Sequence, residues 1–158
     1  MEQNVKWSTT VHVLTVVCWV LLEGVCLLLL WEASWWSLCW AVVITALLVY
    51  AVCLAPLRLK ADEDALLVVR IGRTLRLPYS EIASVGPYRL RGTELRFWGS
   101  GGFMGYTGLF YRKDIGRFHA YVGTWRQAFL VTTRSGGHYV LSCNESERMV
   151  ALLKERIG

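Results

Sequence analysis

Few residues of this 158-residue chain have side chains that could carry catalytic or metal chemistry. The histidines are His12, in a long apolar run, and His119 and His138, in stretches that alternate as strands do. No Gly-x-Ser-x-Gly or His-Glu-x-x-His motif occurs, and the five cysteines form neither a Cys-x-x-Cys pair nor a cluster with histidine. Because catalysis and metal binding need several such groups together, we expect no enzyme, no catalytic residue, no metal and no cofactor.

A glycine-rich stretch at residues 99–108 raises the question of a nucleotide site. It lacks the Gly-Lys-Ser/Thr ending of a phosphate-binding loop, and its glycines do not have the Gly-x-Gly-x-x-Gly spacing that leads from a strand into a helix. Its aromatic residues Phe103, Tyr106 and Phe110 instead predict a segment that folds back onto a sheet. Glycine in such a segment permits tight turns and close backbone approach.

Basic residues give the clearest sign of function. Residues 56–158 hold sixteen bases, thirteen of them arginine, against nine acids, and many of the bases stand next to aromatic residues. Such a surface suits anionic lipid headgroups or the carboxylates of a partner protein. Nucleic acid is a poor fit for a domain tethered close to a bilayer, so we expect none. The residues expected to form the binding surface are Arg89, Arg91, Arg96, Arg112, Lys113, Arg117 and Arg126.

Two long apolar runs precede this basic half, at residues 9–31 and 35–54. Each is long enough to cross about 30 Å of hydrocarbon, and the short connection predicts a helical hairpin over residues 1–55. Tryptophans gather at the connection, as they do at membrane interfaces. Bases flank only the outer ends, at Lys6, Arg58 and Lys60, so the positive-inside rule places both termini in the cytoplasm.

His12 and Glu23 are the ionisable residues within the first run. They are eleven residues apart, about three helical turns, and therefore lie on nearly the same face. Ionisable groups inside a membrane are costly and often functional, which favours a role in sensing protons or a partner. Helix association through a neutral Glu23, with His12 at the interface, remains the plainer interpretation.

Residues 56–158 change to an alternating pattern typical of β-strands. About seven short strands fit between residues 67 and 143, which predicts a small antiparallel barrel or sandwich. Asn144 and Glu147 then form a capping-box start, and Met149 and Leu153 belong to the apolar stripe of one amphipathic C-terminal helix. Such a helix would close one end of the barrel. An oligonucleotide-binding barrel is less consistent, because that fold normally has its helix between strands.

Three segments carry a resemblance to a known family. Residues 76–85, with the sequence Arg-Leu-Pro-Tyr-Ser-Glu-Ile-Ala-Ser-Val, and the stretches 99–110 and 116–121 resemble bacterial pleckstrin-homology (PH)-like domain proteins with an N-terminal membrane hairpin. The resemblance covers about residues 57–157. It implies a partly open β-barrel capped by the C-terminal helix, and it implies no catalytic residues and no particular ligand.

Together these features predict a membrane α-hairpin followed by a cytoplasmic PH-like domain at residues 56–158. We expect a non-enzymatic binding or scaffold module in the bacterial inner membrane, which docks a protein partner, its own copies or anionic lipid headgroups. The alternative is a small integral-membrane subunit in which the pair His12 and Glu23 acts in sensing or in helix association.

Overall fold

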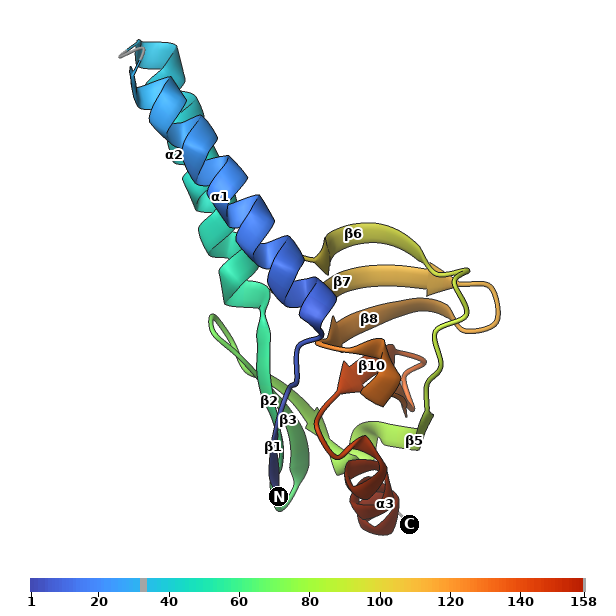
Figure 1. The fold of residues 1–158 in the computed structure, drawn as a ribbon. Helices are drawn as coiled ribbons and strands as arrows, with labels where there is room; N and C mark the ends of the chain where they lie inside the picture. The colour runs from blue at the N-terminus through green and yellow to red at the C-terminus, as the bar shows by residue number, and fades with distance from the viewer. Residues whose placement is uncertain (32–33, 158) are drawn as a thin grey trace.

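Two long helices project from one side of a β-rich body (Figure 1). The computed structural model describes residues 1–31 and 34–157, so the expected connection at residues 32 and 33 lies outside the described part. Helices α1 (Thr9–Trp31) and α2 (Trp35–Leu54) have the predicted bounds. Both are long and apolar enough to cross a membrane, and apolar side chains cover most of their exposed surface.

The first sheet has four antiparallel strands in the order β1-β2-β3-β4. The strands are β1 (Glu2–Asn4), β2 (Pro56–Ala61), β3 (Ala65–Arg70) and β4 (Leu75–Pro78). Strand β1 precedes the helices in sequence, yet it pairs with β2, which follows them. The β-rich body therefore takes strands from both sides of the helical hairpin.

The second sheet has six strands in the order β5-β9-β10-β8-β7-β6. The strands are β5 (Ile82–Pro87), β6 (Leu95–Gly102), β7 (Gly105–Arg112), β8 (Gly116–Val122), β9 (Ala128–Thr133) and β10 (His138–Ser142). Strand β10 pairs parallel with β8, because the chain crosses from β8 to β9 and then returns by a hairpin into the place between them. The PH-like arrangement is confirmed, but its two sheets do not close into a barrel.

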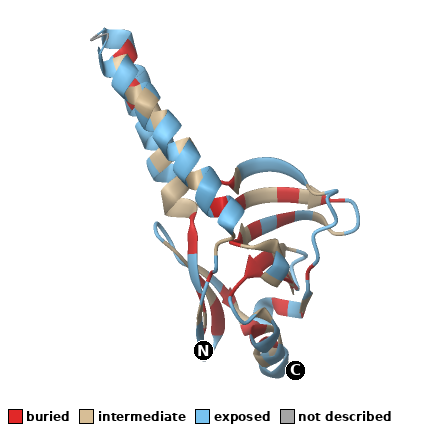
Figure 2. Cartoon of the chain, in the orientation of Figure 1, coloured by how far each residue is buried: buried red, intermediate tan, exposed pale blue. Residues whose placement is uncertain are grey.

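Two apolar clusters form the core, seen as bands of buried residues in Figure 2. The first lies between the four-stranded sheet, β5, β9 and helix α3 (Ser146–Ile157), whose Met149 and Leu153 are fully buried. The predicted apolar stripe of this helix is therefore confirmed, although the helix begins at Ser146, two residues after Asn144. The second cluster lies within the larger sheet, around Phe110 and Phe118.

Candidate functional site

The base of the helical hairpin is fixed to the β-rich body by backbone hydrogen bonds. Val5 N–H donates to the Leu57 carbonyl at 2.9 Å, and Ser8 N–H donates to the Gly123 carbonyl at 3.1 Å. Higher up, the Met104 N–H in the β6–β7 turn donates to Thr15 Oγ1 of α1 at 2.9 Å. These bonds join α1 and the segment before it to both parts of the β-rich body, and so fix where the helix leaves that body.

A polar pocket of about 590 Å³ opens where α1 begins. Its two cationic residues are Lys6, which precedes the helix, and Arg126, in the short turn between β8 and β9. Both side chains belong to exposed residues, and no acidic residue is among those that line the pocket. The full lining is Lys6, Trp7, Ser8, Thr9, Thr10, Thr124, Arg126 and Gln127. The pocket is therefore suited to an anionic group.

An apolar groove continues from this pocket along α1. The groove has a volume of about 400 Å³ and is lined by Thr9, Thr10, Val13, Leu14 and Val17. Thr9 and Thr10 line both the pocket and the groove, so the two are contiguous. A ligand that fills both would have a negatively charged end beside Lys6 and an apolar part along the helix.

The predicted basic residues do not form one site. Arg126 lies in the polar pocket with Lys6, whereas Arg89 and Arg91 lie in the segment between β5 and β6. Exposed bases on the far part of the larger sheet form a second group: Arg96, Lys113 and Arg117. In the sequence, Lys6 served only to orient the helices. Its place beside Arg126 could not be read from the sequence, because the two residues are far apart along the chain.

Arg112 was expected on the binding surface, but its side chain is buried and hydrogen-bonded to other residues of the domain. Its side chain is 9% exposed, and it donates to Asp114 Oδ1 at 2.6 Å and to Glu94 Oε1 at 3.3 Å. It also donates to the Arg89 carbonyl at 3.0 Å and lies 4.5 Å above the centre of the Tyr88 ring. Arg112 is therefore corrected from a surface residue to a structural one.

The carboxylates around Arg112 stay ionised. Burial raises the pKa of Glu94, but hydrogen bonds from the Arg91 backbone, from Tyr88 and from Arg112 outweigh it, so this pKa lies below its ordinary value. A hydrogen bond from Arg112 lowers the pKa of Asp114. Burial, and next the hydrogen bond to Glu94, raises the pKa of Tyr88, which therefore stays protonated. The cluster is a compensated charge network within the fold.

The pair His12 and Glu23 is not joined in the structure. The His12 ring lies against Trp7, with the ring centres 5.6 Å apart, while Glu23 accepts a hydrogen bond of 2.8 Å from Trp19 Nε1. Each side chain thus has its own indole neighbour on or next to α1. At 1.5 Å rise per residue the two are roughly 16 Å apart along the helix, too far for direct proton transfer.

The remaining candidate groups, His119, His138 and Cys143, lie in the larger sheet or directly after it. The His119 ring stacks on Tyr139 at 5.7 Å, and His138 Nδ1 lies 3.3 Å from Thr132 Oγ1. Burial raises the pKa of the Cys143 thiol to about 11, so it is protonated at neutral pH. Within residues 1–31 and 34–157, no group of three or more His, Cys, Asp or Glu side chains is arranged to hold a metal ion.

Two sheets with a C-terminal helix packed against the first core define a PH-like domain, a class of fold whose members generally bind and do not catalyse. A family model described as Bacterial PH domain matches residues 57–157. The chain belongs to this family, as the resemblance in its sequence indicates. No match was found among curated proteins or among solved structures. The family model covers neither the two helices nor β1.

Proposed function

We propose that the protein is a non-enzymatic PH-like module, anchored in the bacterial inner membrane by its helical hairpin, that binds an anionic phospholipid headgroup. One observation carries the proposal: the polar pocket with Lys6 and Arg126 continues into an apolar groove on α1. A phospholipid has the same two parts, a charged headgroup and apolar chains. The family's general binding or scaffold role agrees with this use.

The place of the pocket supports a lipid ligand. Residue Thr9 begins the apolar helix, so the pocket lies where the proposed membrane span meets the cytoplasm. Trp7 lines the pocket, and indoles favour the headgroup level of a bilayer. Lys6, Arg58 and Lys60 all lie at this end of the hairpin, which supports a cytoplasmic position for both termini.

The pocket gives a direct binding test. The full chain in detergent would be titrated with dihexanoyl phosphatidylglycerol, dihexanoyl phosphatidylcholine and glycerol phosphate by calorimetry. We expect the anionic lipid to bind more tightly than the zwitterionic lipid, because Lys6 and Arg126 meet a net negative charge. We expect glycerol phosphate to bind more weakly than the anionic lipid, because it places nothing in the apolar groove.

Paired variants make the test specific. Basic residues near an anionic headgroup contribute about 1 kcal/mol each, so Lys6→Ala with Arg126→Ala should weaken binding of the anionic lipid about 30-fold. The matched control is Arg134→Ala with Lys154→Ala, which removes the same charge from exposed positions outside the pocket. Equal binding of both lipids, or equal loss in the two double variants, would overturn the proposal.

A further inference from the structure

Strand β6 presents an apolar edge on the outside of the six-stranded sheet. It is the last strand in the sheet order, and its outer edge has no paired strand within the described residues. Three large apolar side chains on it are well exposed: Leu95 at 62%, Phe97 at 59% and Trp98 at 71%. An exposed apolar edge of this size normally marks a contact surface or an aggregation hazard.

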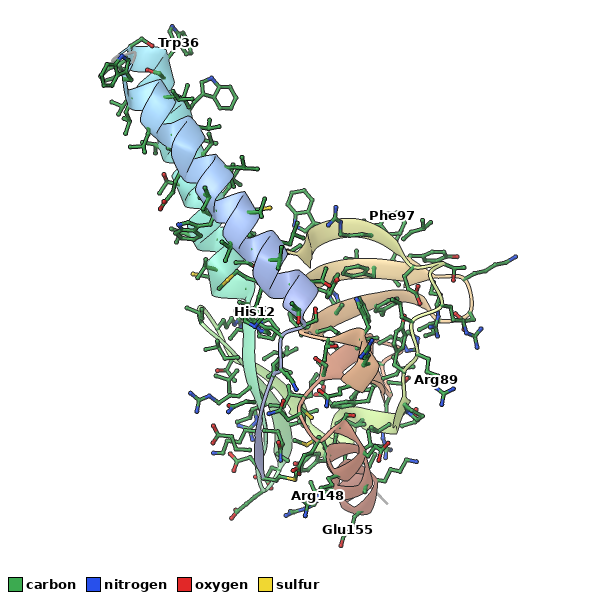
Figure 3. The ribbon with its side chains drawn as sticks, in the orientation of Figure 1. His12, Trp36, Arg89, Phe97, Arg148 and Glu155 are labelled. Carbon is green, nitrogen blue, oxygen red and sulfur yellow. The ribbon has the colours of Figure 1, made fainter. Side chains whose placement is uncertain are left out.

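The helical hairpin and β6 line a common open apolar cavity of about 460 Å³. Its lining includes Leu22 of α1 and Ile44 of α2 together with Trp98 and Phe103. Because Trp98 lines this cavity together with residues of both helices, it lies beside the apolar surface of the hairpin. Figure 3 shows Phe97 on the same side of the body as the helices.

We propose that this β6 edge lies in the headgroup region of the leaflet through which α1 enters, with Leu95, Phe97 and Trp98 inserted into the bilayer. The β6 side of the larger sheet then lies against the membrane surface, while α3 lies at the far end of the body from the helices (Figure 1). This inference rests on the membrane-spanning hairpin of the proposed function, but it is independent of the pocket formed by Lys6 and Arg126.

The surroundings of the edge favour lipid over a second copy of the chain. The β6–β7 register shifts between Arg96 and Trp98, and such an irregularity hinders edge-to-edge strand pairing. The edge is also continuous with the apolar surface of the helices through the shared cavity. Arg117 lies 5.8 Å above the Phe97 ring and, with exposed Arg96, can meet lipid phosphates beside the inserted side chains.

The headgroup region can also supply hydrogen-bond partners for the unpaired backbone groups at the outer edge of β6. Unpaired N–H and C=O groups are costly in hydrocarbon, where no hydrogen-bond partner is present. At the headgroup level, water and phosphate oxygens supply those partners, while aromatic rings still find apolar surroundings. The mixture of open backbone, aromatic rings and arginine on β6 therefore matches the interface and not the bilayer centre.

The test uses the full chain, labelled with 5-fluorotryptophan, at one copy per lipid nanodisc. The ¹⁹F resonance of Trp98 is assigned by its loss in Trp98→Phe. We expect a nitroxide-bearing lipid to broaden this resonance strongly and an aqueous gadolinium chelate to broaden it weakly. Trp36, at the outer end of α2, reports whether the hairpin is in the bilayer.

The outcomes separate the two proposals. If the nitroxide lipid broadens Trp36 but not Trp98, this inference is overturned and the hairpin is still in the membrane. If the lipid broadens neither resonance, the membrane span is overturned as well. Loss of Trp98 broadening in the double variant Leu95→Asp with Phe97→Asp, but not in Leu90→Asp, would support insertion. Protection of Trp98 from both reagents only when several copies share a disc would show that a second copy covers the edge, contrary to the inference.

Discussion

At the scale of single residues, burial decides what an arginine does. Arg112 is next to Lys113 in sequence, and both belong to the same basic and aromatic stretch. Yet the guanidinium of Arg112 is enclosed by Glu94, Asp114 and the Tyr88 ring, whereas Lys113 is exposed. The second carboxylate oxygen of Glu94 is buried and has no hydrogen-bond partner in the described part of the chain. The cluster therefore depends on Arg112 for its charge balance.

Replacing Arg112 should destabilise the fold. At pH 7, Arg112→Met leaves Glu94 buried without its cation, and we expect a loss of about 3 kcal/mol in the free energy of unfolding. The pKa values of Glu94 and Asp114 are lowered in the folded protein, so their contribution is present above about pH 4 and is lost as the pH falls through the folded-state values. The difference between wild type and variant should therefore shrink on acidification, as measured by denaturant unfolding between pH 7 and pH 3.

Lys113→Met provides the control, because it removes the adjacent exposed charge and leaves the cluster intact. Its free energy of unfolding should stay within about 0.5 kcal/mol of wild type. A similar loss in both variants, or a loss in Arg112→Met that does not vary with pH, would show that the cluster has no special role.

At the scale of elements, the β6–β7 hairpin depends on glycine where its two strands approach each other. Gly99 and Gly108 are paired and both have positive φ, at 112° and 129°. A Cβ at Gly108 would overlap the Trp98 carbonyl, so a side chain there is excluded by both the backbone angle and the space. This close approach positions Trp98 beside the helices.

Gly108→Ala should therefore disrupt the hairpin more than Gly116→Ala. Gly116 also has positive φ, at 83°, but a Cβ there would have open space, so its variant should cost only the backbone strain of about 1–2 kcal/mol. We expect Gly108→Ala to cost more and to raise hydrogen exchange across β6 and β7. Equal melting temperatures for the two variants would contradict this account of the hairpin.

Elements defined by local pattern could be predicted from sequence, and those defined by distant partners could not. The bounds of α1 and α2 and the buried stripe of α3 follow from apolar spacing alone. Strand β1 is three residues long and owes its form to β2, on the other side of the helices. The parallel pairing of β8 with β10 and the pocket shared by Lys6 and Arg126 likewise join segments that no local pattern connects.

At the scale of the whole molecule, the helices are an insertion into a sheet. Strands β1 and β2 lie side by side at the base of the hairpin, and Arg58 forms an ion pair of 2.6 Å with Glu2 across them. Val5 is buried in the first core, and Trp7 packs against it. The segment before α1 is therefore part of the folded body, and the hairpin is held at both of its ends.

A chain without the helices should fold if β1 is retained. Residues 1–8 joined to residues 55–157 by a short Gly-Ser linker should unfold cooperatively, because Val5 N–H already lies within hydrogen-bond distance of the Leu57 carbonyl. Residues 55–157 alone lose the burial of Val5 and the β1 pairing, and should be less stable by at least about 2 kcal/mol. Thermal melting and amide spectra of the two proteins provide the comparison. Equal stability would show that β1 contributes nothing to the fold.

The pairing of β1 with β2 also imposes an order on biosynthesis. Glu2 leaves the ribosome early, but its partner strand is made only after both helices, because Lys60 lies opposite Glu2 in the register. At roughly 5–20 residues per second, the first strand waits several seconds without a partner. The first sheet can therefore close only after both helices have been synthesised, so the N-terminal segment stays unpaired throughout the synthesis of the hairpin.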